Sequence, residues 1–178
     1  MSSKPHLSQV NHLFNEHFCN ERIKYIETSK KLQRIKHSNA EYDRVIEHNK
    51  ELADFLFEFL MEKGYIPKTY NGHNITSINP MFRYSKYHPG MQFLIHKDAI
   101  NKNKKTQERS IMTLNIFLNS DFDGGETIFY HNNKVRYIAK PQIGRAMIFD
   151  SQQFHSGEKV QNGYKYLMRT DIMVAYTS

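Results

Sequence analysis

The chain has 178 residues, of which 39% are hydrophobic and 13% aromatic, and this composition is typical of one soluble domain with a sizeable core. Its apolar runs are shorter than the roughly 20 residues that span a bilayer, and its N-terminal segment lacks the apolar stretch of a signal peptide. We therefore expect no membrane association and a cytoplasmic location. The one cysteine, Cys19, excludes an intramolecular disulfide and fits a reducing compartment.

The net charge is +7, from 25 Lys and Arg residues against 18 Asp and Glu residues. A basic balance can favour nucleic acid or an acidic substrate as a partner. The basic residues are spread along the chain without a long Lys/Arg block, so a charged, solvated surface is the simpler explanation.

Residues 1–64 are predicted to be helical and to buttress the rest of the chain. Apolar residues follow helical spacing at 13–18, a further helix capped at Asn20 is expected to run to Leu32, and a clearer pattern covers 42–60. Gly64 lies just beyond that pattern as a C-cap. None of these positions has the spacing of metal ligands, so we interpret this third as scaffold.

Residues 65–178 are predicted to form the β-core of the same domain, which spans 1–178. A loop is expected at 67–80, and beyond it the hydrophobic period changes to two. Many short strands without helices between them indicate an α+β, mainly β protein built on an antiparallel sandwich or barrel, of which the jelly roll is one form. The predicted strands are 81–87, 91–96, 111–118, 127–130, 135–138, 146–149 and 166–175.

The sequence around His96 and Asp98 has the spacing of metal ligands. The two residues are two positions apart on a predicted strand, so their side chains project from one face. A histidine from a distant strand would complete the 2-His-1-carboxylate arrangement of non-haem Fe(II) oxygenases. His155 follows an apolar strand and is a candidate for that third ligand. A bare H-x-D motif is weak evidence among ten histidines.

Lys165 opens an apolar strand ten residues after His155 and shares one strand face with Leu167, Arg169 and Asp171. Burying a cation among apolar neighbours costs several kcal/mol unless an anion meets it. A dicarboxylate cosubstrate would be such an anion. The alternative is a lysine at a strand end that reaches solvent.

The segment 102–109, between the H-x-D strand and the next predicted strand, is polar and lacks large apolar residues. We expect a mobile loop that borders the metal pocket and folds over its mouth when substrate binds. A solvated loop without a role is the alternative.

From about Met81 onward the sequence resembles the Fe(II)/2-oxoglutarate-dependent dioxygenases of the prolyl 4-hydroxylase type. Five motifs, in order and with matching spacing, carry the resemblance. They are Y-x-x-G-x-x-F-x-x-H-x-D at 87–98, T-L-N-I-F-L-N at 113–119, G-G-E-T-I-F at 124–129, P-Q-I-G-R-A-M-I-F at 141–149 and H-S-G-E-K-V-Q-N-G-Y-K-Y at 155–166.

The resemblance implies a double-stranded β-helix core, which is a distorted jelly roll, buttressed by N-terminal helices. It implies that His96, Asp98 and His155 bind iron and serve as the catalytic centre, and that Lys165 pairs with the C5 carboxylate of 2-oxoglutarate. The implied cofactors are Fe(II), 2-oxoglutarate and O2, with ascorbate as a reductant. Three protein ligands leave iron positions for 2-oxoglutarate and O2.

Further cofactor-binding positions follow from the same resemblance. Tyr87 and Thr113 match residues that line the cosubstrate pocket, and Arg169 is a second cation that could assist 2-oxoglutarate or face the prime substrate. Two positions depart from the pattern, because several relatives have tyrosine where this chain has Phe93 or Phe117. The hydrogen bonding of the pocket must therefore differ.

The implied reaction hydroxylates a substrate C–H bond, with release of succinate and CO2. A prolyl residue of a protein or peptide is the leading substrate, and a small molecule is possible. One alternative is hydroxylation or demethylation of nucleic acid, suggested only by the net charge. Another is a catalytically silent β-barrel binding module, against which the three ligand candidates and Lys165 argue. The sequence does not predict the oligomeric state.

Overall fold

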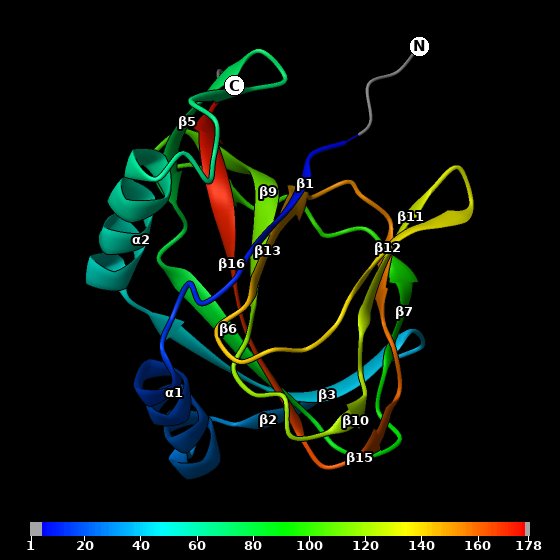
Figure 1. Ribbon diagram of the computed structural model, residues 1–178. Helices are drawn as coiled ribbons and strands as arrows, with labels where there is room; N and C mark the ends of the chain where they lie inside the picture. The colour runs from blue at the N-terminus through cyan, green and yellow to red at the C-terminus, as the bar shows by residue number, and fades with distance from the viewer. Residues whose placement is uncertain (1–4, 177–178) are drawn as a thin grey trace.

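Antiparallel strands dominate the computed structural model, which describes residues 5–176 (Figure 1). The two helices of this part of the chain both lie near its start. The N-terminal elements are β1 (Leu7–Val10), α1 (Glu16–Thr28), β2 (Gln33–His37), β3 (Ala40–His48) and α2 (Lys50–Glu62). None of the described helices is long and apolar enough to cross a membrane.

The remaining elements are all strands. They are β4 (Thr69–Tyr70), β5 (His73–Ile78), β6 (Met81–Tyr87), β7 (Phe93–His96), β8 (Lys102–Asn103), β9 (Glu108–Phe117), β10 (Asp123–Gly124), β11 (Thr127–His131), β12 (Lys134–Ala139), β13 (Ala146–Asp150), β14 (His155–Gly157), β15 (Val160–Asn162) and β16 (Lys165–Ala175). Each of the seven predicted strands overlaps one of these, so the β prediction for this region is confirmed.

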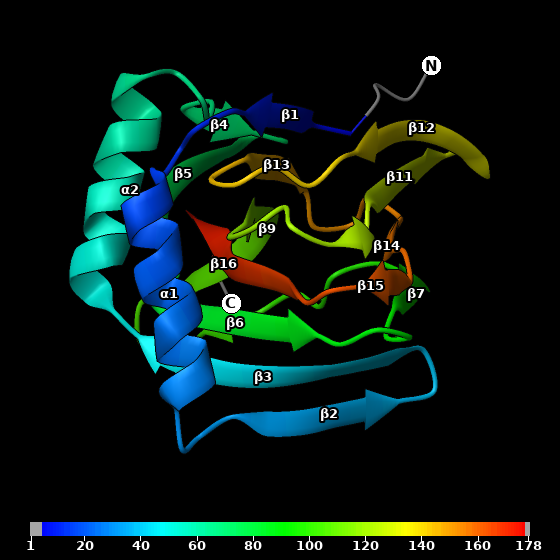
Figure 2. The same ribbon diagram turned by 60° about the horizontal axis from the view of Figure 1, so that its bottom comes forward.

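The large sheet curls back on itself. Its strand order is β1-β13-β9-β16-β6-β3-β7-β14-β11-β12, and β3 is joined to β7 by a single residue pair, Ala40 with Phe93. The sheet bends at this narrow junction, so that β9, β16, β6 and β3 form one wall and β7, β14 and β11 form the other (Figure 2). This is the predicted double-stranded β-helix, or distorted jelly roll.

The two faces of the main wall have different partners. On β9 and β16, side chains such as Leu114 and Met168 belong to the larger hydrophobic core, which also contains buried residues of α1 and α2. Their alternating neighbours, such as Phe117 and Leu167, belong to a second core inside the barrel. Because successive strand residues point to opposite faces, each strand holds the helices and lines the interior at once.

The prediction that residues 1–64 are entirely helical is wrong. α2 overlaps the second half of the predicted 42–60 pattern, but residues 40–48 form β3, which pairs with β2 and with β6. The apolar residues at 42–46 fit either period, and pairing along β6 satisfies the backbone of an extended segment. α1 begins after Asn15, whose side chain accepts a 2.9 Å hydrogen bond from the Phe18 amide, so the cap is not Asn20.

Two predicted loops also contain strands. The 67–80 segment includes β4 and β5, and β5 pairs with β16 at the edge of the main wall. The 102–109 segment forms a short hairpin, in which β8 pairs with the start of β9 through Lys102 and Arg109. Asn103 caps its turn by accepting a hydrogen bond from the Lys105 amide.

Candidate active site

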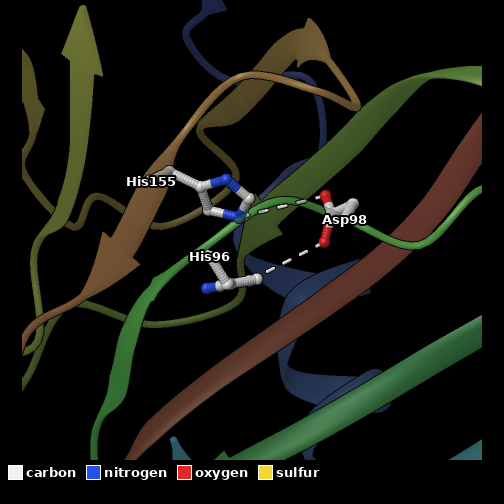
Figure 3. Close-up of side chains that lie close together, drawn as sticks. All are labelled: His96, Asp98 and His155. Carbon is white, nitrogen blue, oxygen red and sulfur yellow. Dashed lines mark ion pairs between the residues drawn. The ribbon is translucent and has the colours of Figure 1, made fainter. Parts of the chain in front are cut away.

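Three side chains with metal-ligand chemistry converge between the two walls. His96 ends β7, Asp98 follows it, and His155 begins β14, where it pairs directly with His96. The Asp98 carboxylate oxygens lie 3.8 Å from His96 Nε2 and 3.9 Å from His155 Nε2. One ligand atom from each residue lies within 4.8 Å of the other two, and the side chains point toward one another (Figure 3).

Both imidazoles are oriented for metal binding. The Nδ1 atom of His96 lies 2.8 Å from the Leu94 carbonyl oxygen, and that of His155 lies 2.9 Å from the Gln153 carbonyl oxygen. Because a carbonyl only accepts, each Nδ1 carries the proton and each Nε2 presents a lone pair to the centre. Burial and the nearby His155 lower the pKa of His96 to about 4, and burial lowers the pKa of His155 as well. Both rings are therefore neutral near pH 7.

Asp98 is the anion of this centre and is only 7% exposed. The Thr113 hydroxyl donates a 2.5 Å hydrogen bond to Oδ2, and Arg169 Nη2 lies 3.2 Å from Oδ1. Burial by itself raises the pKa of a carboxyl group, but Arg169, His155 and Thr113 outweigh it and hold the pKa of Asp98 below its usual range. Asp98 is thus an ionised ligand candidate whose orientation is fixed.

The residues present fit a divalent metal. Two neutral imidazoles and one carboxylate, each oriented by a second hydrogen-bond partner, form the 2-His-1-carboxylate donor set, which is typical of non-haem Fe(II) in oxygenases. The sequence-predicted ligand candidates are all in this cluster, and it is the one cluster of its kind within residues 5–176.

A cavity of about 430 Å³ opens beside the three residues and is lined by both walls. Lys165, Arg169, Tyr87 and Thr113, which the sequence assigns to cofactor binding, all line it. The expectation that 102–109 borders this cavity is wrong. Asn101 lines the cavity, but none of the residues 102–109 does.

Lys165 is the most deeply buried cation of the cavity, at 2% exposure. Its Nζ donates a 2.7 Å hydrogen bond to the Gly125 carbonyl and lies 5.2 Å from the centre of the Tyr87 ring and 5.6 Å from that of Phe117. An ammonium group has three donors, and one carbonyl satisfies one of them. Burial lowers the pKa of Lys165 to about 7, against the opposing effect of Glu126 and Glu158. No carboxylate within residues 5–176 forms an ion pair with Lys165, so an anion is the partner that this group lacks there.

The two phenylalanines that depart from the family pattern are packed into the site. The Phe93 ring stacks on the His96 imidazole, with 3.6 Å between ring centres and 6° between planes. Phe117 is fully buried beneath Lys165. Phe93 thus contacts His96, and Phe117 contacts Lys165, through packing alone. A tyrosine at either position could also have formed a hydrogen bond through its hydroxyl group.

Sequence reasoning missed two further cations of the cavity lining, Arg44 on β3 and Arg83 on β6. Arg44 was missed because its strand was predicted to be helical. Arg83 lies on a correctly predicted strand and has the same parity as Tyr87, so this alternation could have identified it.

The sequence pattern of the 2OG-Fe(II) oxygenase superfamily matches residues 82–171, which is half of the chain and includes all three ligand candidates. The chain therefore belongs to this superfamily. It is a 2-oxoglutarate-dependent dioxygenase, an oxidoreductase whose cofactor chemistry uses Fe(II), 2-oxoglutarate and O2. A comparison with curated proteins found no match for the sequence.

Solved structures with the same fold include several prolyl hydroxylases. A prolyl-4-hydroxylase from Pseudomonas putida has a TM-score of 0.72 at 13% identity, over 96% of this chain and 93% of its own. A viral collagen prolyl hydroxylase from Paramecium Bursaria Chlorella virus-1, solved with 2OG, has a TM-score of 0.68 at 16% identity, over 96% of each chain. A prolyl hydroxylase from Trichoplax adhaerens, solved with a hypoxia inducible factor peptide fragment, has a TM-score of 0.72 at 14% identity, over 93% of this chain and 82% of its own.

Proposed function

We propose that this dioxygenase hydroxylates a prolyl residue of a protein or peptide and converts 2-oxoglutarate to succinate and CO2. The observation that carries the proposal is a single cavity containing both the His96–Asp98–His155 cluster and a buried lysine that lacks an anion. The prolyl substrate is supported by the fold, which this chain shares with prolyl hydroxylases, one of them solved with a peptide.

In this proposal His96, Asp98 and His155 hold Fe(II) through the two Nε2 atoms and the carboxylate. Bound iron, with 2-oxoglutarate and O2, supplies the oxidising chemistry: one oxygen atom enters succinate and the other enters the substrate C–H bond. The protein keeps both imidazoles neutral by burying them, and their Nδ1–H bonds to backbone carbonyls direct each Nε2 lone pair to the centre. It also keeps the Asp98 carboxylate ionised and oriented through Thr113 and Arg169.

Lys165 is proposed to bind the distal carboxylate of 2-oxoglutarate. Its spare N–H donors face a cavity whose nearby walls are aromatic, where a charge-assisted hydrogen bond is stronger than in water. Tyr87 and Thr113 are proposed to shape the same pocket. Ascorbate is proposed as the reductant that keeps the iron in its Fe(II) state, and omitting it should shorten the active lifetime without changing the product.

The substrate proposal is tested by supplying Fe(II), 2-oxoglutarate and O2 labelled with heavy oxygen to the protein with pools of peptides, free amino acids and oligonucleotides. Mass spectrometry then identifies any product that gains one labelled oxygen atom. We expect labelled hydroxyproline in the peptide pool and none in a matched pool without proline. Labelling confined to another residue or to nucleic acid would overturn the prolyl assignment.

A further inference from the structure

A row of arginines occupies the cavity wall on β3, β6 and β16, apart from Lys165. Arg169 pairs directly with Arg83 across β16 and β6. Arg44 on β3 pairs with Ser85, which is two residues beyond Arg83 on the same face of β6. Arg169 follows Lys165 by four residues on one face of β16, which corresponds to about 13 Å of strand. The arginine row is therefore distinct from the proposed 2-oxoglutarate anchor.

The cavity lining is strongly cationic. Arg44, Arg83, Lys165 and Arg169 line it, and Asp98 is the one carboxylate that does so within the described residues. When Asp98 is committed to a metal and Lys165 to 2-oxoglutarate, the three arginines remain. Like charges on directly paired strand residues repel each other, so this arrangement needs anions to stabilise it.

The acidic partners of these arginines do not balance them. Arg83 and Arg169 share one carboxylate, that of Asp171, at 3.1 Å and 3.2 Å. Arg169 also lies 3.2 Å from Asp98, the carboxylate that a bound metal would engage. Arg83 is also largely buried, with 13% of its side chain exposed. Arg44 forms no ion pair and no side-chain hydrogen bond with any residue in 5–176. Arg44, and the donors of Arg83 that its Nη1 hydrogen bond to Asp171 does not use, can thus meet an anion that enters the cavity.

The position of Arg44 and Arg83 indicates that the anion belongs to the prime substrate and not to 2-oxoglutarate. Their lining neighbours Ile46 and Met81 are 43% and 38% exposed, so this part of the wall is the open side of the cavity. This open side gives a prime substrate access to the cavity that contains the metal cluster. 2-oxoglutarate would have its own cation deeper inside.

We propose that Arg44 and Arg83 form a subsite for a carboxylate of the prime substrate, so that the enzyme prefers an acidic group beside the carbon that it hydroxylates. This inference rests on the proposed function of the cavity. Planar guanidinium groups match a carboxylate with two parallel hydrogen bonds. The carboxylate is either an Asp or Glu side chain of a peptide or the free terminus of a small substrate.

A phosphate of nucleic acid is the less favoured anion. Binding to a polynucleotide backbone depends on many cations distributed over an open surface. Here Arg44 and Arg83 line a single cavity of about 430 Å³ that 2-oxoglutarate must share. A single small acidic group fits that space.

The test measures binding to the Fe(II)-loaded protein with 2-oxoglutarate in the absence of O2. Equilibrium dialysis with mass-spectrometric detection compares a mixture of capped dipeptides acetyl-Asp-X-amide with the corresponding acetyl-Asn-X-amide, where X is each standard amino acid. A second pair of mixtures, N-acetyl amino acids and their amides, tests a free terminal carboxylate. We expect the acidic member of one pair to bind about tenfold to a hundredfold more tightly than its neutral match.

The variants R44Q and R83Q should each lose this preference while 2-oxoglutarate affinity stays within about twofold of the wild type. R83K keeps the charge and should keep part of the preference, which guards against an R83Q protein that folds poorly. R109Q is the matched control, because Arg109 lies outside the cavity lining and contacts His73. It should keep the full preference.

The outcomes for the acidic group and for proline are separate. Acid preference with X other than proline supports the subsite and overturns the prolyl substrate. If proline dipeptides bind without any preference for the acidic form, the prolyl substrate is supported and the carboxylate subsite is overturned. If no acidic probe binds more tightly than its neutral match, or if R44Q and R83Q both keep the preference, the subsite does not exist. A short single-stranded oligonucleotide that binds only through Arg44 and Arg83 would assign them to phosphate instead.

Discussion

The guanidinium of Arg169 lies 3.2 Å from the Asp98 carboxylate and equally close to that of Asp171. A cation on β16 therefore contacts the acidic ligand candidate of the metal cluster directly. Lys165, at the start of the same strand, contacts neither carboxylate and is surrounded by aromatic rings. We therefore propose different tasks for the two cations, with Arg169 orienting Asp98 and Lys165 binding an anion.

Replacing Arg169 with alanine should weaken Fe(II) binding about tenfold to a hundredfold, since partners that orient a metal ligand typically contribute that much. 2-Oxoglutarate affinity should change much less. Metal titration without O2, followed by 2-oxoglutarate titration at saturating metal, separates the two effects. If Arg169→Ala loses 2-oxoglutarate while Lys165→Met keeps it, the two roles must be exchanged.

Replacing Lys165 with methionine should raise the Kd for 2-oxoglutarate about 30-fold or more, because losing one partner of a buried charge pair costs roughly 2–5 kcal/mol. Methionine keeps much of the volume against Tyr87 and Phe117, so the fold should persist. Lys134→Met on the exposed strand β12 is the matched control and should bind 2-oxoglutarate normally. Equal affinity in both variants would remove Lys165 from the cosubstrate site.

The buried lysine also predicts a pH dependence of stability for the metal-free protein. Burial lowers the pKa of Lys165 to about 7 from 10.5. Between about pH 7 and pH 10 the unfolded chain keeps a proton that the folded chain has lost, so the free energy of unfolding should rise with pH. The contribution should be on the order of 1 kcal/mol per pH unit within that window.

Denaturant unfolding of the wild type and of Lys165→Met at several pH values measures this contribution. The variant lacks the titrating group. The free energy of unfolding of the wild type should therefore rise relative to that of the variant as the pH increases. A difference that is constant over the whole window would show that Lys165 titrates near its ordinary pKa.

Thr113 should affect metal binding through its hydroxyl alone. Thr113→Val keeps the branched shape on β9 and removes the 2.5 Å hydrogen bond to Asp98, so Fe(II) affinity should fall about tenfold or more. Thr113→Ser retains the hydroxyl and should restore most of the affinity. Equal losses in both variants would indicate a packing effect in place of the hydrogen bond.

The parts of this fold that the sequence predicts are those where one face of a strand differs from the other. β6, β9 and β16 direct alternate residues to the helix side and the cavity side, and the spacing of His96, at the end of β7, and Asp98, just beyond it, follows the same period. β3 was assigned to a helix because its apolar residues fit both periods, and its pairing with β6 is a long-range interaction that a local pattern does not contain. Arg44, on that strand, was missed for the same reason.

The assignment of the metal centre is tested most directly by the variants His96→Ala, Asp98→Ala and His155→Ala. The control is His131→Ala on β11, since His131 does not line the cavity. Fe(II) binding and the succinate formed from 2-oxoglutarate are measured for each folded protein. We expect one Fe(II) per chain and 2-oxoglutarate turnover in the wild type and in His131→Ala, with both lost or severely reduced in the other three variants. Wild-type Fe(II) binding and turnover in all three would contradict the assignment of the metal centre.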